Sequence, residues 1–294
     1  MKKAAILLDS SSLYDGKSEK NIFMIPLTII LNYNGFKEYK ETTEISSEKI
    51  YDLVKQGKKL STSQPSIGEG ILIIEKLLKE YETIYVIPLS KEISGTYDTF
   101  KSISKELDEK RVIILDCGFV GISLLDIIAK NILKMVEKEE SKEAIINYVE
   151  KIWREKFGAT FILNDIGHLK RGGRIGTVAS FLAGILKFKI ILKIDGKIDL
   201  VDKKTSLKEA VDVCLKTIDD KIQFSKNGIN KIQIWSNNID NSEKANELKK
   251  YVIEWLKNKK IEFDSSSFDS LPNLASVLTI HTGSDTIGIF VLAN

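Results

Sequence analysis

The chain has 294 residues, of which 43% are hydrophobic and 29% are charged, and its 44 basic residues nearly balance its 41 acidic ones. This length allows one large or two medium domains, and a net charge of +3 gives no electrostatic signature of nucleic-acid or membrane binding. No stretch reaches the ~18 uninterrupted apolar residues that span a bilayer, and Asp9 ends the first apolar run too early for a signal peptide. We therefore expect a cytoplasmic protein with no nucleic-acid partner and no stable membrane insertion.

The first half of the chain alternates apolar, strand-like runs with helical segments. We expect strands at 4–8, 84–89 and 112–115, and helices at 46–56, 71–81, 94–107, 122–136 and 141–153. The segments 22–31 and 36–41 flank Asn32-Tyr-Asn-Gly35, whose Asn-Gly pair predicts a hairpin and therefore a β-ribbon inserted at about 21–42. Strands that alternate with helices predict right-handed crossovers and a parallel sheet.

Composition changes near residues 156–158, where we place a boundary between an N-terminal domain (1–157) and a C-terminal domain (158–294). In the second domain we expect strands at 160–163, 190–194, 197–201, 232–235, 276–281 and 287–292, and helices at 178–188, 206–216 and 242–257. The predicted fold class is α/β, with a parallel-sheet N-terminal domain that carries the ribbon and a C-terminal α+β domain.

The stretch Leu60–Gly70 is a hydroxyl-rich loop that leads into a helix. Ser66 and Glu69 have the spacing of a capping box. A helix N-terminus offers backbone N–H groups and the positive end of the macrodipole, and Thr62 and Ser63 add donors just upstream. This pattern is typical of a site for a carboxylate or a phosphate, although capping and turn formation alone also explain it.

Three hydroxyl-bearing segments, Asp9–Ser12, Thr62–Ser66 and Ser94–Thr96, follow predicted strands or are expected near their ends. Ligands of parallel α/β sheets bind outside the carboxyl ends of the strands. We therefore expect these segments to converge on one crevice.

The second domain contributes a basic loop and a histidine. Gly167–Gly176 is the most basic and glycine-rich loop, and its arginines are interpreted either as contacts to an anion or a partner, or as a solvated turn. His281, at the end of a predicted strand, is either structural or a donor to a bound head group. A triad of Ser94, His281 and Asp9 can be drawn, but no G-x-S-x-G elbow supports it.

The sequence offers no pattern for a cofactor or a metal. It lacks a P-loop, a G-x-G-x-x-G motif and an H-E-x-x-H motif, and it contains only two histidines. Cys117 and Cys214 lie far apart in apolar surroundings, which is typical of buried thiols in a reducing compartment. We expect no metal and no cofactor.

Taken together, the motifs resemble the DegV family of bacterial fatty-acid-binding proteins. The matching pieces occur in the family's order and span almost the whole chain: Asp9-Ser10-Ser11, Thr62-Ser-Gln-Pro-Ser66, Ser94-Gly-Thr96, Leu169-Lys-Arg-Gly-Gly-Arg174-Ile and His281-Thr-Gly283. The Thr-Ser-Gln-Pro-Ser and Ser-Gly-Thr motifs are the specific ones.

The resemblance implies one long-chain fatty acid buried between the two domains, and an ATP-dependent fatty acid kinase subunit that converts the bound fatty acid to an acyl phosphate. It implies a carrier that is not catalytic by itself and that serves phospholipid metabolism. The residues implied to bind the carboxylate are Thr62, Ser63, Ser94, Gly95, Thr96, His281 and Thr282. Arg174 is implied either to meet the kinase or to position the head group.

The apolar helix expected at 178–188 is the candidate tunnel wall, through Phe181, Leu182, Ile185 and Leu186, and ordinary core packing is the alternative interpretation. Burial of an acyl chain yields ~0.8 kcal/mol per methylene, which suits an apolar wall.

Two departures from the family pattern affect the expected ligand. Asp116-Cys117-Gly118-Phe119 replaces a small polar run, and Ser284-Asp285 replaces a proline and glycine next to the proposed head-group site. Two other functions remain open: a small-molecule hydrolase that uses Ser94 and His281, and a binding module for another acidic metabolite, which predicts a short polar cavity.

Overall fold

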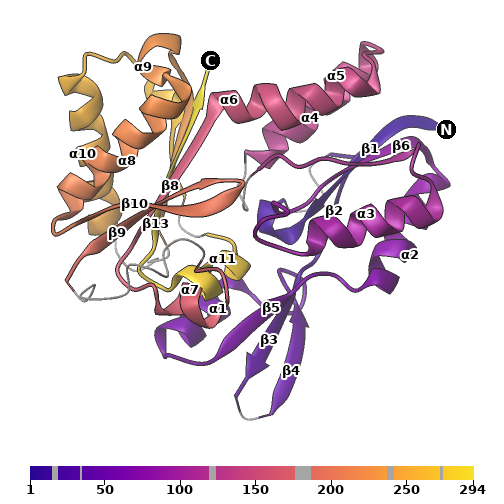
Figure 1. Ribbon diagram of the computed structural model, residues 1–294, viewed down its shortest axis with the longest axis horizontal. Helices are drawn as coiled ribbons and strands as arrows, with labels where there is room; N and C mark the ends of the chain where they lie inside the picture. The colour runs from indigo at the N-terminus through magenta and orange to yellow at the C-terminus, as the bar shows by residue number, and fades with distance from the viewer. Residues whose placement is uncertain (15–18, 34, 119–123, 176–186, 237–241, 272–273) are drawn as a thin grey trace. The chain divides into compact units, whose positions relative to one another are not determined.

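The computed structural model describes residues 1–14, 19–33, 35–118, 124–175, 187–236, 242–271 and 274–294 (Figure 1). The chain divides into two compact units. The first contains residues 1–50, 58–153 and 275–277, and the second contains residues 51–57, 154–274 and 278–294. The main division therefore falls between residues 153 and 154, and two short segments join the unit on the other side of it in the sequence.

The first unit is built on a parallel sheet with the strand order β2-β1-β6-β7. The strands are β1 (Lys2–Asp9), β2 (Ile22–Ile25), β6 (Tyr81–Ile87) and β7 (Val112–Ile114). The predicted parallel sheet is confirmed. The prediction that residues 22–25 belong to the ribbon is wrong, because Ile22 pairs with Ile6 of β1 instead. Pro26 follows β2 directly, and because it has no backbone N–H it ends this strand before β3 of the ribbon begins.

Helices cover this sheet and complete the core of the first unit. Their bounds are α2 (Ile67–Leu78), α3 (Thr96–Leu107), α4 (Leu125–Glu137) and α5 (Lys142–Asn147), followed by a π-helical turn at Tyr148–Trp153. Side chains of α2 and α3 pack on the sheet face that carries Leu7 and Val86, while α4 lies against β1 (Figure 1). The strands read as nearly continuous apolar runs because they are buried between helices.

A three-stranded antiparallel sheet, with the order β4-β3-β5, is the inserted ribbon. Its strands are β3 (Thr28–Asn32), β4 (Phe36–Lys40) and β5 (Leu60–Ser63), and α1 (Ser47–Lys55) lies between β4 and β5 in the sequence. The predicted hairpin is confirmed. The expected loop at 60–63 is a strand instead, because its backbone pairs with the free edge of β3, a tertiary contact that local sequence does not reveal.

The second unit contains a six-stranded sheet with the order β10-β9-β8-β13-β11-β12. The strands are β8 (Phe157–Leu163), β9 (Lys189–Asp195), β10 (Lys197–Lys204), β11 (Ile229–Ser236), β12 (Phe268–Leu271) and β13 (Ile287–Ala293). The β11–β12 pair is parallel, and the other pairs are antiparallel. The predicted β9–β10 hairpin is confirmed, and Gly196 turns it with a φ of +77°.

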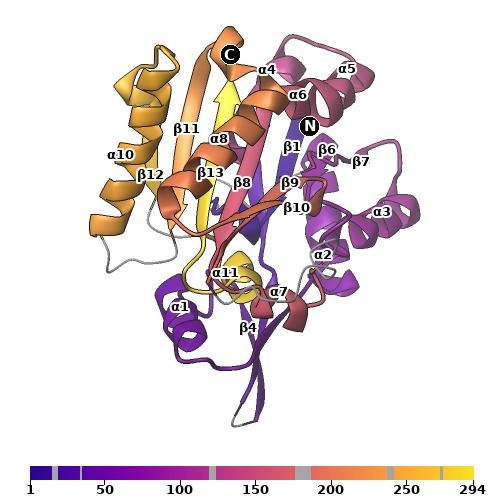
Figure 2. The ribbon, with the colours of Figure 1, turned by 60° about the vertical axis from the view of Figure 1, so that its left-hand side comes forward.

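The two faces of this sheet have different chemistry. Helices α8 (Leu207–Ile222) and α10 (Ser242–Asn258) build a core with one face (Figure 2). The short helices α6 (Arg154–Lys156), α7 (Gly167–Arg171) and α9 (Phe224–Asn227) complete the connections. The opposite face is aromatic, since Phe290 packs with its ring centroid 5.3 Å from that of Phe161 and 6.1 Å from that of Trp235.

The segment predicted as a strand at 276–281 is the helix α11 (Ser276–Thr282), so that prediction is wrong. Apolar and polar residues alternate from Leu278 to His281, as they do in a strand, and the polar Ser276 and Thr279 are buried with the apolar side chains. Periodicity cannot distinguish such a run from a buried strand. Gly283 ends the helix with a φ of +92°. The expected apolar helix at 178–188 falls almost wholly on 176–186, which lie outside the described residues.

Candidate functional site

The carboxyl edge of the parallel sheet carries buried polar groups. Asp9, the last residue of β1, accepts a hydrogen bond at Oδ2 from the Leu89 backbone N–H at 2.6 Å. Its Oδ1 accepts from both the backbone N–H and the hydroxyl of Ser11. Burial raises the pKa of Asp9, and these hydrogen bonds oppose that rise. The carboxylate therefore ties the end of β1 to the loop that follows β6.

That loop leads into the hydroxyl pair of Ser94 and Thr96. The two hydroxyl oxygens lie 2.9 Å apart, and Ser94 Oγ also accepts from the Thr96 backbone N–H at 3.3 Å. Thr96 begins α3, and Gly95 precedes it without a side-chain cap. The first N–H groups of a helix have no intrahelical acceptor, so this end of α3 offers donors and a positive dipole beside two hydroxyls.

The segment that contains Thr62 reaches the same end of α3. Gln64 Nε2 donates to Thr99 Oγ1 at 2.6 Å, and a Cβ at Gly95 would collide with the Gln64 carboxamide. Glycine at 95 therefore leaves the space that the Gln64 side chain occupies. The expected convergence of the 62–66 and 94–96 segments is thus present within the first unit. Sequence reasoning quoted Gln64 in the motif but did not assign it a role.

Thr62 and Ser63 are adjacent in β5, so their side chains project to opposite faces of the three-stranded sheet. Thr62 is half-buried, whereas Ser63 is exposed and its hydroxyl donates to the Gln64 carbonyl at 3.2 Å. The capping box at Ser66 and Glu69 is present as predicted. This geometry distinguishes Thr62 from Ser63 as a donor to one bound group.

Glu41 is a buried carboxyl group that sequence reasoning missed. It follows β4 directly, its Oε2 accepts from Ser10 Oγ, and its Oε1 accepts from the Val277 backbone N–H at 3.0 Å. Ser10 Oγ in turn accepts from the Leu27 N–H at 2.9 Å. Burial, together with nearby Asp9, raises the pKa of Glu41 to about 7, against the lowering effect of these hydrogen bonds. The sequence gives no signal for this role, because Glu41 ends a segment, residues 36–41, that contains several other charged residues.

In the second unit, the structure brings the basic loop and the His281 motif together. Gly172 packs against the His281 ring, where a Cβ would overlap Nδ1, and Gly283 packs against the His168 ring. His168 Nδ1 lies 3.2 Å from the Ile280 carbonyl oxygen. Burial, then the charge of Arg174 and the nearby His168, lowers the pKa of His281 to about 4. His281 is therefore neutral at pH 7 and can donate one N–H.

Arg174 and Thr282 have defined contacts in this cluster. Arg174 Nη1 donates to the Gly172 carbonyl at 2.6 Å, which holds the guanidinium near His281. The Thr282 hydroxyl donates to the Leu278 carbonyl at 2.9 Å within α11. That bond uses the only proton of the hydroxyl, so Thr282 is a poor donor to a carboxylate while it lasts.

The two departures from the family pattern have separate surroundings. In the first unit, Asp116 Oδ1 accepts from the Gly118 N–H at 2.9 Å, and Lys91 Nζ lies 3.8 Å from Asp116 Oδ2. In the second unit, Asp285 is exposed and lines a cavity of about 200 Å³ with Asn164, Lys189 and other residues.

Several predictions concern absences or residues outside this description. The described part of the chain contains no group of three or more His, Cys, Asp or Glu side chains arranged to hold a metal. Within the same residues, no helix is long and apolar enough to cross a membrane. Cys117 and Cys214 are buried free thiols. The proposed tunnel-wall residues Phe181, Leu182, Ile185 and Leu186 lie outside the described residues.

The fold is a mixed α/β fold with buried polar groups at the carboxyl edge of its parallel sheet. Comparison with known proteins assigns the chain further. The DegV family model matches residues 3–294, and the chain belongs to this family.

Relatives and solved structures match along nearly the whole chain. The DegV domain-containing protein MG326 of Mycoplasma genitalium is 28% identical over 301 residues, which cover 99% of both chains. A solved structure of DegV from Bacillus subtilis, described as a fatty acid binding protein, superposes with a TM-score of 0.79 at 23% identity and full coverage of both chains. A fatty acid binding DegV protein, SAG1342 of Streptococcus agalactiae, gives a TM-score of 0.82 at 19% identity, again over both full chains. At these identities the structures establish the mixed α/β fold.

We predict that His281 titrates at about pH 4 and that this lowers stability in acid. Because the folded-state pKa lies below the unfolded value of about 6.5, the unfolded chain binds more protons between these values, and stability rises with pH across that window. NMR titration of the imidazole signals measures the pKa directly. The chain has two histidines, so His168→Gln leaves a single signal to assign. Titration of His281 near pH 6.5 would contradict its desolvation.

Glu41 should act in the opposite direction. Its folded-state pKa of about 7 exceeds the ordinary value of 4.5, so the folded chain binds more protons and stability falls as pH rises from 4.5 to 7. In urea titrations, the stability of wild type relative to Glu41→Gln should decrease over this range. Glu38→Gln, at an exposed position in β4, is the matched control for the substitution itself. A difference between wild type and Glu41→Gln that does not change with pH would rule out the ionisation of Glu41.

Proposed function

We propose that this protein binds one long-chain fatty acid and presents its carboxylate to a partner kinase. The observation that carries the proposal is the Ser94–Thr96 hydroxyl pair at the N-terminus of α3, with the Gln64 segment packed beside it. Solved DegV structures described as fatty-acid-binding support it, among them one loaded with heptadecanoic acid at a TM-score of 0.75.

The proposed carboxylate donors are neutral groups. Hydroxyls and helix N–H groups bind a carboxylate by charge-assisted hydrogen bonds, each worth about 1.5–3 kcal/mol. In this proposal Ser94 and Thr62 donate to the carboxylate, Gly95 and Thr96 supply the helix N-terminus, and His281 gives its single N–H. We assign Ser63 and Thr282 lesser roles, because the hydroxyl of each already donates to a backbone carbonyl.

The acyl chain needs an apolar surface, and we propose the aromatic face of the second unit's sheet as part of it. Phe161, Trp235 and Phe290 lie on the face opposite to the α8 core, and each is at most 2% exposed. A tail of roughly fourteen methylenes gains on the order of 10 kcal/mol from burial, before the cost of association. Phe181, Leu182, Ile185 and Leu186 remain the predicted remainder of the wall.

The proposed partner reaction explains why a catalytic cluster is not needed in this chain. One carboxylate oxygen attacks the γ-phosphorus of ATP, an O–P bond forms, the bond to the bridging oxygen breaks, and ADP leaves with that electron pair. A fatty acid is already deprotonated at neutral pH, so no general base is required. The lipid-binding chain positions the carboxylate, and the kinase binds ATP. Arg174 either contacts the kinase or orients the head group. Dependence on ATP also favours the expected cytoplasmic location.

The hydrolase alternative is less well supported. A Ser–His–Asp triad requires the aspartate to accept from an imidazole, and the hydrogen bonds of Asp9 in the structure come from Leu89 and Ser11. A polar-metabolite module would not account for the buried aromatic face. The fatty acid proposal uses both the hydroxyl edge and this face.

Loss of both proposed hydroxyl donors should weaken fatty acid binding. Ser94→Ala with Thr62→Val keeps the shape of each side chain, and the loss of one charge-assisted bond alone corresponds to roughly ten- to a hundredfold in Kd. Binding of oleate to delipidated protein is measured by calorimetry, and bound lipid is identified by mass spectrometry of an organic extract. Ser102→Ala is the matched control, because its hydroxyl is exposed and donates within α3.

A double-mutant cycle with Ser94→Ala and His281→Gln then tests whether one carboxylate meets both residues. A coupling free energy above about 0.5 kcal/mol indicates a shared ligand, whereas additive losses indicate independent effects. An extract free of lipid, together with no oleate uptake by wild type, would refute the fatty acid proposal.

The kinase proposal predicts that acyl phosphate forms only when a fatty acid kinase subunit is added. The oleate-loaded chain is incubated with ATP, with and without that subunit, and hydroxylamine traps acyl phosphate as the hydroxamate. The chain alone should give none, because it contributes position rather than ATP binding. Hydroxamate formed by the chain alone would instead show that the chain is catalytic. The Ser94→Ala variant is assayed at saturating oleate, so a lower yield of hydroxamate then reports poor presentation of the carboxylate and not poor binding.

A further inference from the structure

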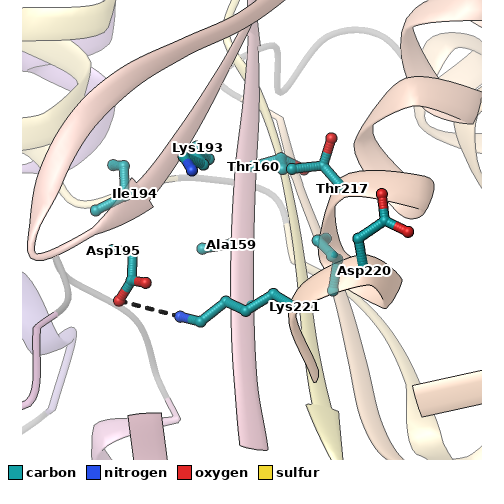
Figure 3. Close-up of a pocket in the computed structure, with 10 residues that line it drawn as sticks. Ala159, Thr160, Lys193, Ile194, Asp195, Thr217, Asp220 and Lys221 are labelled. Carbon is teal, nitrogen blue, oxygen red and sulfur yellow. Dashed lines mark ion pairs between the residues drawn. The ribbon is translucent and has the colours of Figure 1, made fainter. Parts of the chain in front are cut away.

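A second cavity lies wholly within the second unit, on the sheet face that α8 covers. It has a volume of about 360 Å³ and is formed by β8, the end of β9 and the last turns of α8 (Figure 3). Pockets of this size accommodate small metabolites. The residues that line it are not those of the hydroxyl edge or of the His281 cluster, so the fatty acid proposal does not use them.

The cavity and the Arg154 guanidinium beside it bring together three cations and two carboxylates. Asp195 Oδ1 pairs with Lys221 Nζ at 3.1 Å and with Arg154 Nη2 at 3.5 Å (Figure 3 shows the Lys221 pair). Lys193 lines the same cavity, and so does Asp220, which is exposed. Burial lowers the pKa of Lys221, and the charges of Arg154 and Lys193 lower it further against the attraction of Asp195. An additional negative charge would relieve this repulsion.

The cavity is also lined by a residue with a buried hydroxyl, Thr160. Thr160 is 0% exposed, and the Cys214 thiol is the hydrogen-bonding neighbour of its hydroxyl. Thr160 lies directly opposite Lys193 in the β8–β9 pair, so both side chains project from the same sheet face. A thiol is only a weak hydrogen-bonding partner, so a bound oxyanion would give this hydroxyl a stronger acceptor.

We propose that this cavity binds a small phosphorylated metabolite through its phosphate group. Lys193 and Lys221 supply ammonium groups, and Thr160 and Thr217 supply hydroxyls from β8 and from α8. With Arg154 counted, three cations face the two carboxylates of Asp195 and Asp220, so an anionic ligand is favoured. A neutral ligand would leave the excess of cations in place, and a cationic ligand would add to it. The site is independent of fatty acid binding.

Inorganic phosphate is the probe that tests this site. Its binding to the full chain is measured by calorimetry and by phosphorus NMR at low ionic strength, with sodium chloride at matched ionic strength as the screening control. Lys193→Met and Lys221→Met should each weaken phosphate binding about tenfold, the loss of one charge-assisted contact. Lys197→Met is the matched control, because Lys197 lies on the same hairpin and its ammonium pairs with Asp199 at 3.5 Å.

Asp195→Asn should change phosphate affinity in the direction opposite to the two lysine variants. If the cavity is a phosphate site, removal of the competing carboxylate should tighten phosphate binding severalfold. If the Asp195–Lys221–Arg154 cluster is only structural, the variant should lose stability without a gain in phosphate affinity, and the proposal fails. The proposal also fails if sodium chloride at matched ionic strength abolishes phosphate binding. It fails as well if Lys197→Met weakens phosphate binding as much as Lys193→Met and Lys221→Met do. Oleate binding should be unchanged in every one of these variants, so this result is separable from the fatty acid proposal.

Discussion

The hydrogen bonds to the Asp9 carboxylate are the constraint on which the polar edge of the first unit depends. A buried carboxylate without a cation is costly unless donors surround it. Here the donors come from Leu89 and Ser11, so the end of β1 and the loop after β6 are held together. The next residue, Ser10, donates to Glu41, and Glu41 accepts the N–H of Val277 at the start of α11. A chain of neutral donors and buried acids thus fixes the end of β1, the residue after β4 and the start of the loop that leads to Ser94.

In the second unit, the two faces of one sheet contribute to two different proposed sites. Alternation along β8 sends Phe157 and Phe161 to the aromatic face and Gly158 and Thr160 to the helix-covered face. Gly158 lets α8 approach closely, because a Cβ there would lie 2.6 Å from Ile218 Cγ2. The same close approach brings the end of α8, with Lys221, to the cationic cavity. A single strand therefore contributes both to the proposed acyl surface and to the proposed phosphate site.

Local sequence signals were sufficient wherever the structure depends on short-range contacts. The capping box at Ser66, the helix that follows Ser206, the turns at Gly35 and Gly196, and the buried strands all follow from residue type and spacing. The failure at α11 is local, because residues 278–281 alternate apolar and polar types as a strand does. The other failures share one cause, which is tertiary pairing. Whether residues 22–25 and 60–63 are strands of a particular sheet depends on a neighbour far away in the sequence. Gln64 and Glu41 were overlooked for the same reason, since their partners Thr99 and Val277 are distant in the chain.

The packing of glycines against the two imidazoles has a consequence for how these positions vary in evolution. Gly172 has an ordinary helical φ of −79°, so its backbone does not require glycine, and only the volume of the His281 ring excludes a side chain there. Gly283 has a φ of +92°, so glycine is favoured there whatever occupies position 168. Among homologues, residues 172 and 281 should therefore change together, with a larger residue at 172 tolerated once the imidazole is lost. Position 283 should keep its glycine independently of both.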